Sequence, residues 1–199
     1  MTFIPEARIE ARAAELWRRH ELTVGFDVER LLDELSLSLL WEEVDDGEEA
    51  IVLGQLIPQK RQVVLNERHV EKLEENERRL LRFTLAHEIG HFELHARHFQ
   101  ELAFDDDERT WCRDGSPDPV ERQAEMFSAA LLMPRDVLRV ALPAGDWQGW
   151  QPVYRLADRF GVNVSPMRIR LEKLGWMHLD EQDTPRAGPS PGPGQSPLF

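Results

Sequence analysis

The sequence His87-Glu88-Ile89-Gly90-His91 lies in a proline-free segment of helical periodicity, and it constrains this chain more than any other feature. Four residues along a helix advance about 6 Å and turn slightly more than once, so both imidazoles lie on one face. Two ring nitrogens at this spacing can each reach one zinc ion at about 2.1 Å. Glu88 points about 100° away from this row, where its carboxylate can contact a water rather than the metal. The motif therefore predicts a metal-binding helix that carries a general base.

A plain helix with two unrelated histidines is the alternative, because seven histidines in 199 residues make a chance pair at this spacing fairly common. A third ligand would favour the metal site. His95 lies about 12 Å along the helix from His87, too far to complete a tetrahedron around one ion. The metzincin pattern needs a glycine and a histidine where this chain has Leu94 and Arg97. We therefore expect the third ligand from a different helix.

The segment 120–133 has helical periodicity and offers two carboxylates one turn apart, Glu121 and Glu125. If Glu121 binds zinc, Glu125 can accept a hydrogen bond from the far ring nitrogen of a ligand histidine. A solvated face of two glutamates is the alternative, and such faces are common in acidic proteins. In combination with the histidine pair, metal ligation by this face is favoured over a solvated face.

Composition excludes several classes of protein. Lys and Arg number 24 against 37 Asp and Glu, and the formal net charge of −13 argues against a surface that binds nucleic acid on all sides. Cys112 is the only cysteine, which excludes an internal disulfide and a zinc site built from several cysteines. No run approaches the roughly 20 apolar residues of a membrane span, and no secretory signal is visible. We expect a cytoplasmic globular protein.

The periodicity predicts an α+β fold, in which a small three-stranded antiparallel sheet packs with helices that include the zinc-binding one. Asp27 is expected to cap the second helix. Helices are expected at residues 5–22, 28–35, 120–133, 153–160 and 165–174, and from residue 74 through the histidine motif. Strands are expected at residues 37–41, 51–53 and 62–65, joined as a meander. A loop is expected at residues 104–119.

Three domains are expected: a metal-binding, zincin-like domain at residues 1–143, a helix-turn-helix-like lobe at 144–182, and a tail at 183–199. The tail holds five prolines and three glycines in 17 residues, so we expect it to be disordered. In the lobe, Ala157 and Gly161 have the spacing of a tight corner between two helices. Candidate contacts to DNA or a protein partner are Arg155, Arg159, Arg168, Arg170 and Lys173. A helical corner that only packs against the rest of the chain is the alternative.

Two segments together resemble the ImmA/IrrE family of metallopeptidases. They are Phe83-Thr-Leu-Ala-His-Glu-Ile-Gly-His-Phe-Glu-Leu-His and Glu121-Arg-Gln-Ala-Glu-Met-Phe-Ser-Ala-Ala-Leu-Leu-Met-Pro134. The resemblance implies that His87, His91 and Glu121 bind zinc and that Glu88 is the general base. Glu125 departs from the Asn or Asp that is more common at this position, which keeps it open as a substitute ligand.

The resemblance implies a zinc-dependent endopeptidase of the gluzincin type, in which Mn²⁺ could replace Zn²⁺ in vitro. Its substrate would be a helix-turn-helix repressor, often encoded by a neighbouring gene, in phage, mobile-element or stress-response control. The chain would be a short form without a C-terminal sensor domain. The alternative is a non-proteolytic regulator that binds a repressor or DNA and whose zinc is structural. Candidates to hydrogen-bond the oxyanion are His69, His95, His98 and Tyr154.

Overall fold

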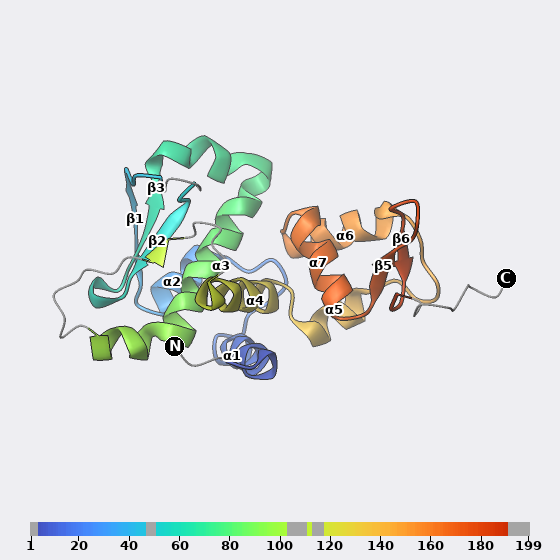
Figure 1. The fold of residues 1–199 in the computed structure, drawn as a ribbon, viewed down its shortest axis with the longest axis horizontal. Helices are drawn as coiled ribbons and strands as arrows, with labels where there is room; N and C mark the ends of the chain where they lie inside the picture. Colours follow the sequence, from blue (N-terminus) through green and yellow to red (C-terminus); the bar gives the residue numbers. More distant parts are fainter. Residues whose placement is uncertain (1–3, 47–50, 103–110, 113–117, 191–199) are drawn as a thin grey trace. The chain divides into compact units, whose positions relative to one another are not determined.

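The structure is a computed structural model that describes residues 4–46, 51–102, 111–112 and 118–190, with the side chains of residues 96–102 and 111–112 left undescribed. The chain forms two compact units, Met1–Pro134 and Arg135–Phe199 (Figure 1). The division therefore falls at Pro134 and not at the expected residue 143. Helix α5 (Arg135–Ala141), which the sequence analysis did not predict, begins the second unit.

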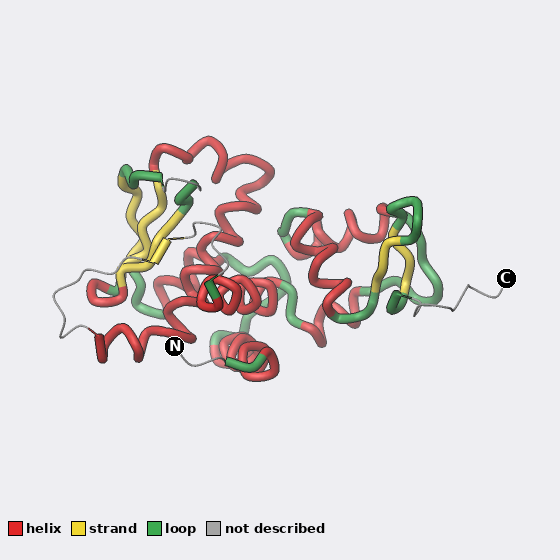
Figure 2. Tube along the Cα trace, in the orientation of Figure 1, coloured by secondary structure: helices red, strands yellow, loops and turns green. Residues whose placement is uncertain are grey.

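The first unit contains a small mixed sheet, visible beside the helices in Figure 2. Its strands are β1 (Ser38–Glu42), β2 (Gly54–Ile57), β3 (Gln62–Asn66) and β4 (Trp111–Cys112), in the order β1-β3-β2-β4. Strand β3 pairs parallel with β1 and antiparallel with β2. The expected antiparallel meander of three strands is therefore wrong in its order and in the direction of one pairing.

The physical reason for this order lies in β3. Val63, Val64 and Leu65 are all fully buried, so both faces of this strand are covered and it takes a central place between two neighbours. Strand β1 consequently pairs with β3 instead of β2, and residues 43–53 connect β1 to β2 without pairing the two strands. The strand expected at residues 51–53 begins at Gly54.

Four helices accompany the sheet: α1 (Glu6–Arg19), α2 (Val28–Glu34), α3 (Val70–Leu102) and α4 (Pro119–Leu132). The side chain of Asp27 accepts the backbone N–H groups of Glu29 and Arg30, which confirms the predicted cap of α2. Helix α4 packs against both α1 and α3, and α3 packs against β2. The indole of Trp17 donates to the backbone oxygen of Leu131 at 2.6 Å and ties α1 to α4.

Helix α3 is interrupted near its start. Asn76, Glu77 and Arg78 have φ angles of 49°, 58° and 59°, which lie in the left-handed region. The regular helix that carries the histidine motif therefore begins after this turn, later than the expected residue 74. From residue 84 to residue 91 every position is buried, so this part of α3 is covered on all sides.

The second unit contains α5, α6 (Trp150–Phe160), α7 (Val164–Lys173) and a hairpin of β5 (Met177–Leu179) with β6 (Pro185–Ala187). Gln148 adds an antiparallel bridge to Arg186 of β6. Gly161 ends α6 with a φ of 63°, a left-handed conformation that glycine adopts without steric cost. None of the described helices in either unit is long and apolar enough to cross a membrane.

The expected disorder of residues 183–199 is wrong for residues 183–190, which complete the hairpin. The carboxylate of Asp180 accepts the backbone N–H groups of Gln182 and Thr184 and pairs with Arg186 at 2.8 Å. Pro185 is buried. Turn hydrogen bonds therefore order a segment whose composition predicts disorder, and residues 191–199 lie outside the described part of the chain.

Candidate metal centre

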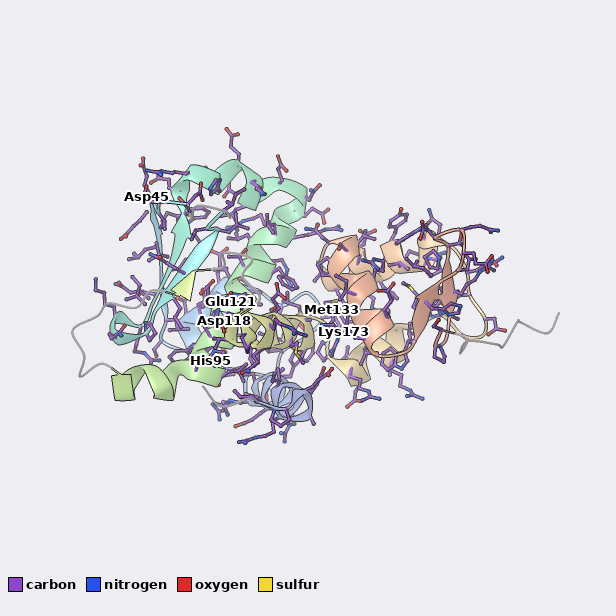
Figure 3. The ribbon with its side chains drawn as sticks, viewed as in Figure 1. Asp45, His95, Asp118, Glu121, Met133 and Lys173 are labelled. Atoms are coloured by element: carbon purple, nitrogen blue, oxygen red, sulfur yellow. The ribbon has the colours of Figure 1, made fainter. Side chains whose placement is uncertain are left out.

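The first unit brings His87, His91 and Glu121 together between α3 and α4. The Nε2 atoms of the two histidines lie 2.9 Å apart, and the Glu121 carboxylate lies 3.1 Å from His87 Nε2 and 3.2 Å from His91 Nε2. All three residues are buried, and their ligand atoms lie within 4.8 Å of one another. Figure 3 shows Glu121 with Asp118 and His95 where the two helices meet.

These residues fit a zinc ion by the chemistry of their donors. Two imidazole nitrogens and one carboxylate oxygen form one of the standard protein ligand sets of a catalytic zinc, which leaves a fourth position open. Tetrahedral ligands at about 2.05 Å from an ion lie about 3.3 Å from one another, close to the separations observed. Glu121, which lies with the two histidines, belongs to α4 and not to α3.

The electrostatics of the site favour a cation. Burial raises the pKa of the Glu121 carboxyl, but the hydrogen bonds with His87 and His91 outweigh burial and lower its pKa to about 2. Burial lowers the pKa of His91, but the hydrogen bond to Glu121 and the charges of Glu88, Glu121 and Asp118 raise it overall. The carboxylates around the imidazoles therefore create a negative potential that also favours a metal ion.

Glu88 is fully buried on α3, next to the first histidine, and its charge acts on His91. The sequence analysis missed Asp118, which also acts on His91. Its side chain accepts the N–H of Val120 at 2.9 Å and caps α4. An Asp directly before a proline at the start of a helix is a recognisable cap signal, so its place at the helix start could have been predicted.

Glu125 is exposed, which does not support its predicted hydrogen bond with a ligand histidine or a role as substitute ligand, and both stay predictions. The exposed positions of α4 are Pro119, Arg122 and Glu125, which follow one another at helical spacing, whereas Glu121 and Ala124 face the interior. The rotation of about 40° between positions four apart is enough to carry Glu125 out of the buried face.

A different side chain of α4, that of Gln123, contacts His95, which lies four residues after the second histidine of the motif. His95 is 8% exposed, and its Nε2 lies 3.2 Å from Oε1 of the buried Gln123. Burial lowers the pKa of His95 to about 4, so its ring is neutral at physiological pH. The ring of His95 lies 5.5 Å from that of His91, centroid to centroid.

The other candidate oxyanion donors are His69, Tyr154 and His98. His69 forms an ion pair with Asp46 at 2.9 Å on the side of the sheet connections. Tyr154 belongs to the second unit, and the side chain of His98 lies outside the described residues. His95 already shares a hydrogen bond with Gln123.

The five basic residues that were predicted as contacts differ in their exposure and partners. Arg155, Arg159 and Lys173 are exposed. Arg168 bonds both carboxylate oxygens of Glu172 at 2.9 Å. Arg170 is only 4% exposed, which leaves little of it available for the predicted contact with DNA or a partner.

An α+β unit with two histidines four apart on one helix and a glutamate from a second helix is the arrangement of a metallopeptidase. The model of the IrrE N-terminal-like domain (Peptidase_M78) matches residues 45–172. The chain belongs to this family, which confirms the resemblance to the ImmA/IrrE metallopeptidases.

Several solved structures match the chain. One of them is a Mycobacterium tuberculosis transcriptional regulator, 17% identical, with a TM-score of 0.53 over 83% of this chain. This chain spans 46% of that protein, a little under half of its length. No curated protein matches the chain.

Proposed function

We propose that this protein is a zinc-dependent endopeptidase that cleaves a helix-turn-helix repressor. The observation that carries the proposal is the convergence of His87 Nε2, His91 Nε2 and the Glu121 carboxylate within 4.8 Å, beside the buried Glu88. Membership of a peptidase family supports the same reaction class.

In this proposal His87, His91 and Glu121 hold the ion, and Glu88 acts on the water. Zinc, when bound, supplies a Lewis acid that polarises the scissile carbonyl and acidifies a water. Glu88 takes the proton of the attacking water and returns it to the leaving amine. The burial of residues 84–91 keeps the charges of the site away from bulk water, which strengthens their action on the substrate.

Charge supports a basic protein as substrate. Residues 1–134 contain 30 acidic and 16 basic side chains, a formal net charge of −14, whereas residues 135–199 contain 7 and 8 and have a net charge of +1. DNA-binding proteins present clustered Lys and Arg, which an acidic catalytic unit attracts over long range. A DNA-binding repressor therefore fits this unit better than an acidic substrate.

A second candidate function concerns the second unit. The helix pair α6 and α7, followed by the hairpin, has the element order of a helix-turn-helix with a β-hairpin appended, and Arg155, Arg159 and Lys173 are exposed on its helices. These features support contact with a repressor or with DNA. The exposed Glu181 and Asp183 at the hairpin turn oppose contact with phosphates and favour a protein partner.

The test is incubation of the purified protein with a helix-turn-helix repressor encoded by the adjacent gene, in the presence of Zn²⁺ or Mn²⁺. We expect discrete cleavage that stops on addition of a chelator and that is absent in Glu88→Gln. Binding of the repressor without cleavage by either form would instead establish the non-proteolytic regulator with a structural zinc.

A further inference from the structure

The two helices of the metal centre cross closely at Gly90. A Cβ atom built on Gly90 would lie 3.1 Å from the backbone oxygen of Ala124, 3.2 Å from its Cα and 3.2 Å from Cδ1 of Phe127. Two of these three atoms belong to the backbone of α4, so no side-chain movement would make room. The crossing sets the distance between α3 and α4, but one contact point leaves the angle between two helices undetermined.

A second contact between the same helices lies further along α3, and on α4 it is made by Gln123, the residue next to Ala124. His95 is five residues beyond Gly90, about 7.5 Å along α3. Its ring N–H donates to Oε1 of Gln123 at 3.2 Å, and both side chains are buried. We call this buried pair, His95 and Gln123, the clasp.

We propose that the clasp positions the Glu121 carboxylate against the two histidines and so sets the affinity of the centre for its metal. The proposal rests on the metal site of the proposed function. Together, the crossing and the clasp define the angle between the helix that supplies two ligands and the helix that supplies the third. Gln123 is two residues from Glu121, so a rotation of α4 that breaks the clasp also moves the carboxylate.

The chemistry of the clasp supports a role in orientation. Two apolar side chains of similar size could be buried at this place without the cost of dehydrating a ring nitrogen and an amide. A hydrogen bond differs from such a contact in being directional. The ring of His95 also lies 5.5 Å from that of His91, centroid to centroid. The clasp therefore lies next to a ligand histidine through His95, and it belongs to the helix of Glu121 through Gln123.

Four variants of the full chain test the proposal. Gln123→Met and His95→Phe keep the approximate size of each side chain and remove the hydrogen bond, whereas Gln123→Glu keeps an acceptor for the ring N–H. Ser128→Ala is the matched control, because it removes a partly buried hydrogen bond of α4, from Ser128 Oγ to the Glu125 carbonyl at 2.8 Å, outside the clasp. The readouts are the zinc dissociation constant from chelator competition, the visible absorption spectrum of the Co²⁺-loaded protein, and thermal unfolding of the metal-free protein.

We expect Gln123→Met and His95→Phe to bind zinc about 10–100-fold more weakly, the effect typical of lost support behind metal ligands, and to shift the cobalt spectrum. The double variant should bind zinc only a little more weakly than the weaker-binding single variant, because both substitutions remove the same hydrogen bond. Gln123→Glu should keep most of the affinity, and Ser128→Ala should match the wild type in both metal readouts. If His95→Phe does not fold, the metal readouts of Gln123→Met decide the test of the proposal.

Wild-type zinc affinity together with a wild-type cobalt spectrum in folded Gln123→Met would overturn the role of the clasp and leave the proposed function standing. Failure of the wild-type protein itself to bind zinc would overturn both proposals. A melting temperature lowered in Gln123→Met with no change in either metal readout would show that the clasp only stabilises the fold.

Discussion

Arg12 of α1 holds the carboxylate of Glu93, two residues after the second histidine of the motif, through its Nε at 2.7 Å and its Nη2 at 2.5 Å. The Glu93 side chain is 4% exposed, whereas that of Arg12 is 35% exposed. The N-terminal helix therefore supplies the countercharge for an acidic group that lies almost fully inside the catalytic unit.

Replacement of Arg12 by Met should destabilise the protein by about 2–4 kcal/mol, because it leaves the Glu93 carboxylate buried without its partner. Chemical denaturation measures the loss. Arg19→Met is the control, since Arg19 pairs with the half-exposed Glu15 on the surface of the same helix and should change stability by no more than about 0.5 kcal/mol. Equal losses of stability in the two variants would show that the burial of Glu93 does not determine how much its pair with Arg12 stabilises the protein.

Gly90→Ala should destabilise the protein by about 1–3 kcal/mol, because the added methyl group meets the backbone of Ala124. The sign of the change in stability is diagnostic, since helix propensity alone would make this substitution stabilising by about 1 kcal/mol. Zinc affinity should fall as well, because the helices that carry the ligands separate. A variant that melts at or above the wild-type temperature would show that the crossing tolerates a side chain.

Glu88→Gln preserves the shape of the side chain and both histidines but removes the group that exchanges a proton. We expect a folded protein with wild-type zinc content and a loss of cleavage of about 10²–10⁴-fold, as is typical when general catalysis is lost. Zinc analysis and a repressor cleavage assay measure the two properties. Cleavage at the wild-type rate would rule out the proposed mechanism.

Glu121→Ala and Glu125→Ala form a matched pair on one helix. Glu121→Ala removes a ligand oxygen, so zinc should be lost on dialysis and excess zinc should restore activity poorly. Glu125→Ala should retain zinc and activity, because this side chain is exposed whereas that of Glu121 is buried. Loss of zinc from Glu125→Ala alone would place the third ligand one turn further along α4.

The stability of the second unit should depend on pH through Asp180. Its hydrogen bond with Arg186 is the largest of the contacts that lower the pKa of its carboxyl below the ordinary value of 3.8. A lowered pKa contributes stability that is present above 3.8 and is lost as the pH falls through the value in the folded protein.

Asp180→Asn should therefore melt below the wild type at neutral pH, and the difference should shrink as the pH falls below the ordinary pKa of this carboxyl. Thermal unfolding at several pH values tests this. Glu181→Gln, at the exposed neighbouring position, should change neither the melting temperature nor its pH dependence. A difference between Asp180→Asn and the wild type that is independent of pH would mean that the charge is not responsible.

Local features of the chain were predictable from the sequence. The histidines of the motif share a helix face because four residues make about one turn, whatever surrounds the helix. The cap of α2 by Asp27 and the end of α6 at Gly161 depend on neighbouring backbone groups alone. That a carboxylate on another helix would meet the histidines was predictable, but the choice of Glu121 over Glu125 came from the family resemblance.

Tertiary contacts decided the rest. Strand β1 pairs with β3, and Arg170 is buried. Both outcomes depend on which surfaces are covered by segments that are distant in the sequence. Glu121 and Glu125 have the same spacing signal in the sequence, yet the packing of α4 buries the first and exposes the second. The bond between His95 and Gln123 joins residues 28 positions apart, and such a pairing has no periodicity from which it could be read. Sequence spacing therefore determined which side chains could meet on one helix, whereas the crossing of α3 with α4 decided which side chains of the two helices do meet.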